Sequence, residues 1–64
     1  MKINGVSIAL PTPLPLVELL TQQGYPTTRI AVEKNGEIVP KSAYETTMIA
    51  DGDVLEIVSF VGGG

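Results

Sequence analysis

Apolar residues recur at alternate positions over the first ten residues, and the dipeptide Asn4-Gly5 interrupts them. Alternation with a period of two is typical of a β-strand with one buried face. Asn-Gly favours a tight hairpin turn, because both residues tolerate positive φ. We therefore predict two short antiparallel strands over residues 1–4 and 6–9.

The apolar pattern then changes to helical spacing, with Leu16 and Leu20 one turn apart on a single face. Thr12 is the predicted N-cap. The prolines that follow it fit in a first turn, where a missing N–H has no intrahelical partner to lose. Gly24 provides the C-terminal stop. The predicted helix spans residues 13–23.

The next segment is typical of a second hairpin. Residues 29–34 alternate between apolar and polar positions, and Asn35-Gly36 turns the chain back into a strand over 37–39. Pro40 ends that strand, because proline cannot donate a hydrogen bond to a neighbouring strand.

The rest of the chain leads to the longest apolar segment, residues 54–61. Before it we predict a short irregular or 3₁₀ turn at 41–44. An extended segment follows at 46–49, with Met48 or Ile49 reaching the core.

The order of these elements indicates an α+β fold. A single helix must cover one face of a mixed sheet of about four to five strands, with the last strand at its centre. The natural closure of this arrangement is a β-grasp. We predict one domain over residues 1–61 and a flexible glycine tail over 62–64.

Size and composition exclude several kinds of function. A chain of 64 residues forms a thin core, which makes a deep enclosed active site unexpected. The sequence has no cysteine or histidine, so it offers no thiolate, no disulfide and no imidazole base. We predict no catalytic residue and no metal ligand in this chain.

Charge and hydropathy exclude other partners. The formal net charge of −3 disfavours nucleic acid, because phosphate contacts require clustered basic residues. No apolar run approaches the roughly 20 residues that cross a bilayer, and the N-terminus lacks the apolar segment of a signal peptide. We expect a small cytoplasmic protein that is not inserted in a membrane.

Two sets of candidate side chains favour structural roles. Asp51 and Asp53 flank a glycine, and aspartates in such turns hydrogen-bond nearby backbone N–H groups far more often than they perform acid–base chemistry. Tyr25 and Tyr44 are expected to be half-buried, with their hydroxyl groups in water.

The last strand has a second face that the helix does not cover. If Leu55 and Ile57 face the helix, then Val58 and Phe60 face outward on the open side of the sheet. We predict that Val58, Phe60 and the neighbouring Val61 form a docking surface for a partner.

The most informative segment is Gly62-Gly63-Gly64, which directly follows the last strand. The simplest alternative is an inert flexible linker. A terminal diglycine, however, presents an α-carboxylate that no Cβ shields, and a narrow channel in a partner enzyme can admit such a backbone. An activated carboxylate of this kind is an electrophile that sulfur or an amine can attack.

The whole chain resembles the sulfur carriers of thiamine biosynthesis, which are ubiquitin-like β-grasp proteins that end in Gly-Gly. The resemblance rests on the order and spacing of several segments. These are Ile3-Asn4-Gly5, the Leu-Leu helix, the stretch from Val32 to Pro40, the stretch from Asp51 to Val58, and Val61-Gly62-Gly63-Gly64.

This resemblance implies a mechanism. An adenylating enzyme of the ubiquitin-activating type uses ATP and Mg²⁺ to form an acyl-adenylate at Gly64, and a sulfur donor protein converts it to a thiocarboxylate. Thiazole synthase then receives the sulfur. Gly62 and Gly63 are the tail that enters the partner's active site, and the chain itself binds no cofactor.

Two other functions remain open at this point. The carrier could deliver sulfur to molybdopterin or another acceptor, although relatives of that kind have a longer insertion before the last strand. The domain could also be a non-covalent ubiquitin-like binding module that uses a sheet face or edge.

Overall fold

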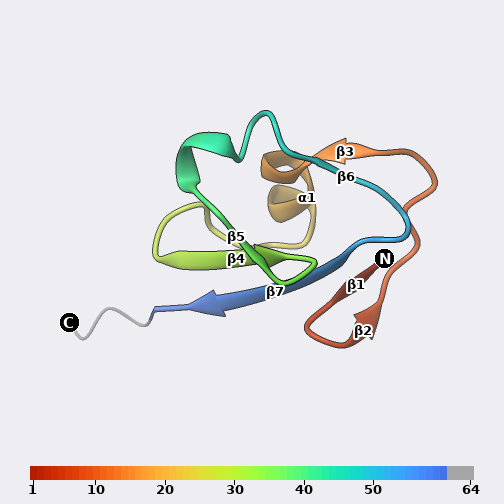
Figure 1. Cartoon of the computed structure of the whole chain (residues 1–64), viewed down its shortest axis with the longest axis horizontal. Coiled ribbons are helices and arrows are strands. Elements are labelled where there is room, and N and C mark those ends of the chain that lie inside the picture. The colour runs from red at the N-terminus through yellow and green to blue at the C-terminus, as the bar shows by residue number, and fades with distance from the viewer. Residues whose placement is uncertain (61–64) are drawn as a thin grey trace.

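The structure, a computed structural model, describes residues 1–60. Within them, α1 lies on one face of a five-stranded mixed sheet (Figure 1). The strands and helices are β1 (Lys2–Ile3), β2 (Val6–Ser7), β3 (Leu14–Pro15), α1 (Leu16–Gln22), β4 (Ile30–Lys34), β5 (Glu37–Val39), the 3₁₀ helix η1 (Lys41–Ala43), β6 (Met48–Ile49) and β7 (Val54–Ser59).

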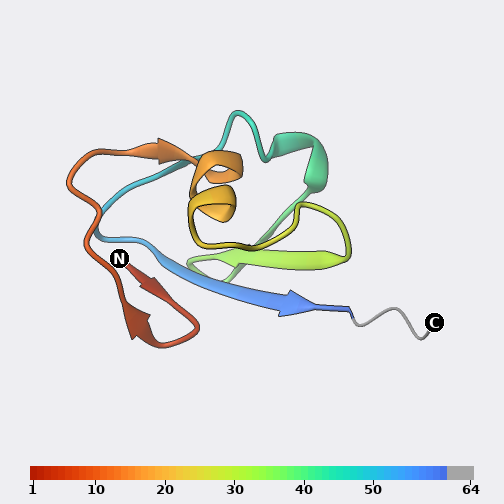
Figure 2. The same cartoon turned by 180° about the vertical axis from the view of Figure 1, so that it is seen from behind.

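The sheet has the order β2-β1-β7-β4-β5, so the last strand is central. β7 is parallel to β1 and antiparallel to β4, while both hairpins are antiparallel. This is the α+β β-grasp arrangement that the element order predicted. Seen from behind, the helix still lies on one side of β4 and β7, with the β1–β2 hairpin beside them (Figure 2).

The core lies between α1 and the covered face of the sheet. Its fully buried large side chains come from the helix, from the middle strands and from β6: Leu16, Leu19, Leu20, Val32, Ile49 and Leu55. The alternation predicted for the last strand is confirmed, because Leu55 and Ile57 are buried while their neighbours are exposed.

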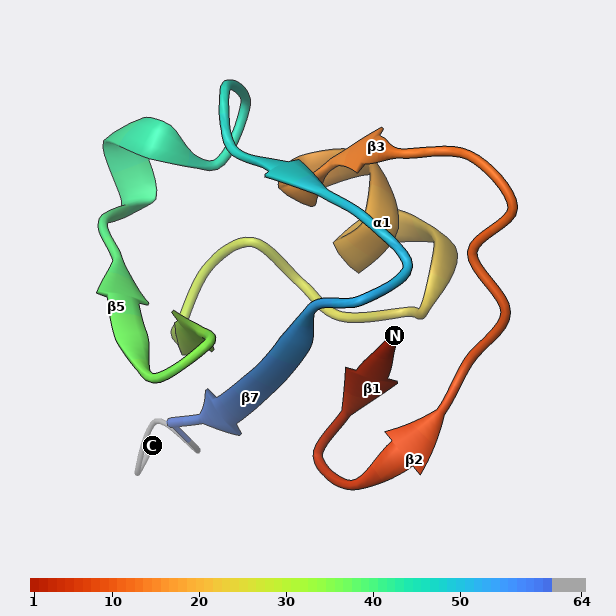
Figure 3. The same cartoon turned by 45° about the vertical axis from the view of Figure 1, so that its right-hand side comes forward.

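The helix begins later than predicted, at Leu16 instead of Pro13. Pro15 forces the residue before it, Leu14, out of the helical region of φ and ψ. Leu14 and Pro15 instead form β3, a strand absent from our prediction, which pairs antiparallel with β6 (Figure 3).

Thr12 is therefore not the N-cap of the helix. The cap position belongs to Pro15, at φ −59° and ψ 144°, and no side chain caps the helix there. Backbone carbonyl groups replace the missing cap. The N–H of Leu16 donates to the Thr47 carbonyl at 2.8 Å, and the next N–H donates to the Tyr44 carbonyl at 3.0 Å. The segment before β6 thus satisfies the helix N-terminus.

Three other expectations are settled by burial and backbone conformation. The 3₁₀ turn is confirmed as η1. Of the two residues considered for the core, Ile49 is fully buried and Met48 is exposed. Tyr44 is buried, not half-buried as predicted, and its burial raises the pKa of its hydroxyl group. Tyr25 is partly buried, as predicted.

The strand predicted over 37–39 is confirmed as β5, while the other predicted strands are shorter than their ranges, and β7 ends at Ser59. Phe60 is still attached to the sheet, because its N–H donates to the Arg29 carbonyl at 2.7 Å. Val61 lies outside the described residues, so the boundary between domain and tail remains a prediction.

Candidate functional site

The candidate site is the end of β7 and the chain that follows it. Gly62, Gly63 and Gly64, with Val61, lie outside the described residues, and their roles remain predictions. The described part of the site is the strand that carries this segment and positions its start. β7 is the central strand of the sheet, between β1 and β4, and it ends one residue before Phe60, the last described residue (Figure 1).

The Asn4 side chain holds β7 from one side. Its Oδ1 accepts a hydrogen bond from the Ile57 N–H at 2.7 Å, and its Nδ2 donates to the Ile57 carbonyl at 3.0 Å. The last backbone pair between β1 and β7 is Ile3 with Leu55. The Asn4 side chain extends the hydrogen bonding along β7 beyond that pair, to Ile57. Asn4 has a φ of 50°, so the same residue forms the hairpin turn and supports the central strand.

The Asn35 side chain holds β7 from the other side, at its beginning. Its Oδ1 accepts from the Val54 N–H at 2.9 Å, and its Nδ2 donates to Asp53 Oδ1 at 3.0 Å. The sequence predicted both asparagines only as turn formers. An amide carries a donor and an acceptor together, whereas a carboxylate offers acceptors alone. Because an asparagine amide can donate and accept at once, the two Asn-Gly asparagines could have been considered from the sequence as side chains that also hold a neighbouring strand.

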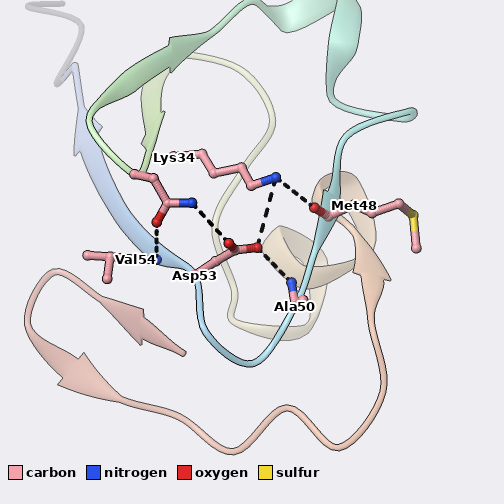
Figure 4. Close-up of polar contacts among 6 residues, drawn as sticks. Lys34, Met48, Ala50, Asp53 and Val54 are labelled. Carbon is pink, nitrogen blue, oxygen red and sulfur yellow. Dashed lines mark hydrogen bonds and ion pairs between the residues drawn. The ribbon is translucent and has the colours of Figure 1, made fainter.

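Asp53 lies at the centre of a polar network before β7 (Figure 4). Its Oδ2 accepts from the Ala50 N–H at 2.8 Å and lies 3.9 Å from Lys34 Nζ, which also donates to the Met48 carbonyl at 3.1 Å. Burial by itself raises the pKa of Asp53, but the hydrogen bonds from Ala50 and Asn35 and the charge of Lys34 lower it below its ordinary value.

These contacts agree with the structural interpretation of the Asp51-Gly52-Asp53 turn. The side chain of Asp51 is 81% exposed and faces the Met1 amino group, not Asp53. Within residues 1–60, no group of three acidic side chains is positioned to hold a metal ion.

We expect Asp53→Asn to lower the free energy of unfolding by about 1–2 kcal/mol near neutral pH, because it removes a charged acceptor from this network. A carboxyl whose pKa is lower in the folded than in the unfolded state stabilises the fold above its unfolded pKa. That contribution is lost as the pH falls through the folded pKa. The difference in free energy of unfolding between Asp53→Asn and wild type should therefore narrow below pH 3.8, which is the ordinary pKa of this carboxyl group.

Urea unfolding of both proteins across this pH range measures the effect. A difference that is the same in acid and at neutral pH would show that the carboxylate charge contributes nothing. Asp51→Asn is the matched control, because that side chain is exposed and its loss should change stability much less.

The sheet face opposite α1 carries the predicted docking residues, and we call it the outer face. Val58 is 57% exposed and Phe60 is 56% exposed, as the alternation along the strand predicted. Val54 adds to the same face at 45% exposure. Their exposed position is thus confirmed, while docking itself remains a prediction.

The sequence analysis missed one apolar member of the outer face, Ile38 on β5. It is 66% exposed and pairs with Glu33 of β4. Glu33 in turn pairs with Glu56 of β7, so these three residues form one row across the sheet. The register of β4 with β5 and of β4 with β7 brings these three residues together. The pattern of apolar residues along each separate strand does not reveal that register.

Two further observations concern other kinds of site. A shallow open depression between the β1–β2 hairpin and the turn before β7 is lined by Lys2, Ser7 and Asp51 among others, away from the C-terminal end of β7. Within residues 1–60, no helix is long and apolar enough to cross a membrane.

Comparison with known proteins identifies the family to which the chain belongs. The sequence model of the ThiS family matches residues 1–64, the entire sequence. The chain belongs to the ThiS family. This confirms the family resemblance inferred from the order and spacing of the segments.

Other ThiS-family relatives agree with this assignment. A crystal structure of the thiamine biosynthesis protein ThiS from Geobacter metallireducens has a TM-score of 0.82 and 32% identity, covering 98% of this chain and 96% of that one. The sulfur carrier protein ThiS of Bacillus subtilis is 51% identical over 35 residues, which are 55% of this chain and 53% of that protein. The match to solved ThiS structures also confirms the β-grasp fold.

A third relative is much longer than this ThiS-family chain. The thiazole synthase of Paramagnetospirillum magneticum is 45% identical over 62 residues, which are 97% of this chain. The chain spans only 19% of that protein's length.

Proposed function

We propose that this chain is a sulfur carrier whose C-terminal carboxylate, on Gly64, becomes a thiocarboxylate that supplies sulfur to the thiazole ring of thiamine. The observation that carries the proposal is the ThiS-family match across the whole sequence, including the three glycines after the central strand. The similarity to a thiazole synthase favours thiazole over molybdopterin as the acceptor.

In the proposed reaction the chain is the substrate of its partners. An adenylating enzyme of the ubiquitin-activating type binds ATP and Mg²⁺, and the Gly64 carboxylate attacks the α-phosphate. Pyrophosphate leaves, and an acyl-adenylate forms. A sulfur nucleophile on a donor protein then attacks the carbonyl carbon and displaces AMP. When that nucleophile is the outer sulfur of a persulfide, the product is an acyl disulfide. A thiol then attacks the donor's sulfur and breaks the S–S bond, which releases the thiocarboxylate and joins the donor and the thiol in a disulfide. Thiazole synthase then uses the thiocarboxylate.

The folded domain has two tasks in this scheme. It presents the tail from a strand that is paired on both sides, with Asn4 and Asn35 fixing its course. It also offers a surface by which partners recognise the carrier, and Val58 and Phe60 lie next to the start of the tail on that surface. Gly62 and Gly63 then allow the carboxylate to enter a narrow channel.

The proposal is tested by the intact mass of the purified protein after incubation with the adenylating enzyme of the same genome, ATP, Mg²⁺ and a sulfur donor. We expect a species in which one oxygen has been replaced by sulfur, with the change located in the C-terminal fragment. Omission of ATP is the control. An unmodified carboxylate under the complete conditions would contradict the carrier function and favour a non-covalent binding module.

A further inference from the structure

A pair of like charges lies at the centre of the outer face. Glu33 of β4 and Glu56 of β7 are direct cross-strand partners. Residues directly opposite in an antiparallel pair project from the same face, with Cβ atoms roughly 5 Å apart. Their neighbours Val32 and Ile57 are buried, so both glutamates project away from the core. Like charges in this arrangement destabilise a sheet.

Neither glutamate has a cationic partner within residues 1–60. The ion pairs there join the Met1 amino group to Asp51 and Lys34 to Asp53. Lys34 follows Glu33 directly, but its side chain extends toward Asp53 and the Met48 carbonyl on the other face (Figure 4). Lys2 of β1 pairs with Val54 and so lies on the same face, but it forms no ion pair with either glutamate in the described residues. No ion pair within them thus offsets the repulsion between the two carboxylates.

Exposed apolar side chains surround this acidic pair. Val54 and Val58 flank Glu56 along β7, and Ile38 lies beside Glu33 on β5; all three apolar residues are at least 45% exposed. A surface with an apolar margin and a charged centre fits a protein partner better than it fits a small ligand. Within such a margin an ion pair is partly shielded from water, which strengthens it.

The charges also indicate what kind of partner fits. A second copy of this chain, docked face to face about a two-fold axis, would bring four carboxylates together at the centre of the interface. Like-charge contacts of this kind disfavour association. A basic side chain, in contrast, would relieve the repulsion within the pair. An arginine suits the position well, since its planar guanidinium can donate to two carboxylates at once.

We infer that the outer face binds an apolar protein surface that presents an arginine or lysine between Glu33 and Glu56. This inference rests on the proposed function and assigns that surface to the adenylating enzyme, which must recognise the folded carrier before any chemistry occurs. Glu33 and Glu56 are then determinants of partner choice at the docking surface already predicted from Val58 and Phe60.

The test compares binding of the adenylating enzyme to wild type, to the double variant Glu33→Gln/Glu56→Gln and to a control, Glu18→Gln/Glu45→Gln. The control removes two exposed negative charges from α1 and from the loop after η1. We expect Kd to rise at least about tenfold in the first double variant, which equals a loss of about 1.4 kcal/mol, and to stay within about twofold in the control. The salt dependence of Kd should also weaken only in the first variant.

Thermal unfolding checks that both double variants fold. We expect the first to unfold at the same temperature as wild type or a few degrees higher, because it removes the cross-strand repulsion. Lower stability would contradict the uncompensated repulsion on which the inference depends.

The outcomes separate this inference from the proposed function. If wild type becomes a thiocarboxylate and both double variants bind equally well, the inference is overturned and the carrier function stands. Selective loss of binding to thiazole synthase alone would overturn the assignment to the adenylating enzyme. A wild-type homodimer that Glu33→Gln/Glu56→Gln strengthens would identify a second copy as the occupant instead. If wild type neither binds the enzyme nor is modified, both proposals fail.

Discussion

Deletion of Gly64 is expected to reduce thiocarboxylate formation by about a hundredfold or more while leaving the fold intact. The shortened chain still ends in a glycine carboxylate, now on Gly63, so its intrinsic reactivity is unchanged. Its reach from the docked domain, however, is shorter by about 3.5 Å. Misplacement of a reacting group by about 1 Å can cost roughly a hundredfold in rate.

The stability of the deletion variant should equal that of wild type, because the core of the described residues ends at Ile57. Urea unfolding checks this, and the intact mass after incubation with the activating enzyme, ATP and a sulfur donor measures the modification. Glu18→Gln/Glu45→Gln is the control, because it keeps the whole glycine tail and changes two exposed side chains elsewhere. Equal modification of the deletion variant and wild type would show that the position of the carboxylate is unimportant, contrary to the proposed mechanism.

Much of the fold followed from local patterns, because each signal depends on neighbouring residues. Both Asn-Gly turns appear where predicted, each with its asparagine at positive φ. The segment from residue 54 is the most apolar one, and it forms the central strand. Alternation along this strand also predicted which side chains would be exposed on its outer face.

The features that the sequence did not reveal depend on contacts between distant residues. Asn4 binds Ile57, 53 positions away, and the carbonyl groups that cap α1 come from the segment before β6. A proline near a helix start is compatible either with the first turn or with an extended residue before it, and pairing with β6 favours the second. The facing glutamates likewise became visible only with the register of β4 and β7.

Leu55→Ala is expected to remove most of the stability of the domain. The side chain is fully buried in the central strand, between the helix and the sheet. Truncation of a buried leucine costs about 2–5 kcal/mol, from lost apolar burial and from the cavity that remains. A core of this size supplies about 3–5 kcal/mol in total. We expect the variant to be largely unfolded at room temperature when its secondary structure is measured by circular dichroism.

Val58→Ala is the matched control, since it removes two methyl groups from the same strand on the opposite face. Val58 is 57% exposed, so the free energy of unfolding should change by about 0.5 kcal/mol or less. The same change should weaken binding to the adenylating enzyme, because it removes apolar surface beside the proposed docking site. A Leu55→Ala variant as stable as Val58→Ala would contradict the packing described above.

If instead Val58→Ala alone unfolded the domain, the outer face would be needed for stability, and its apolar side chains would no longer indicate a partner. The alternation along β7 therefore puts the side chains that stabilise the core and those proposed to bind a partner on opposite faces of one strand, which precedes the glycine tail in the sequence.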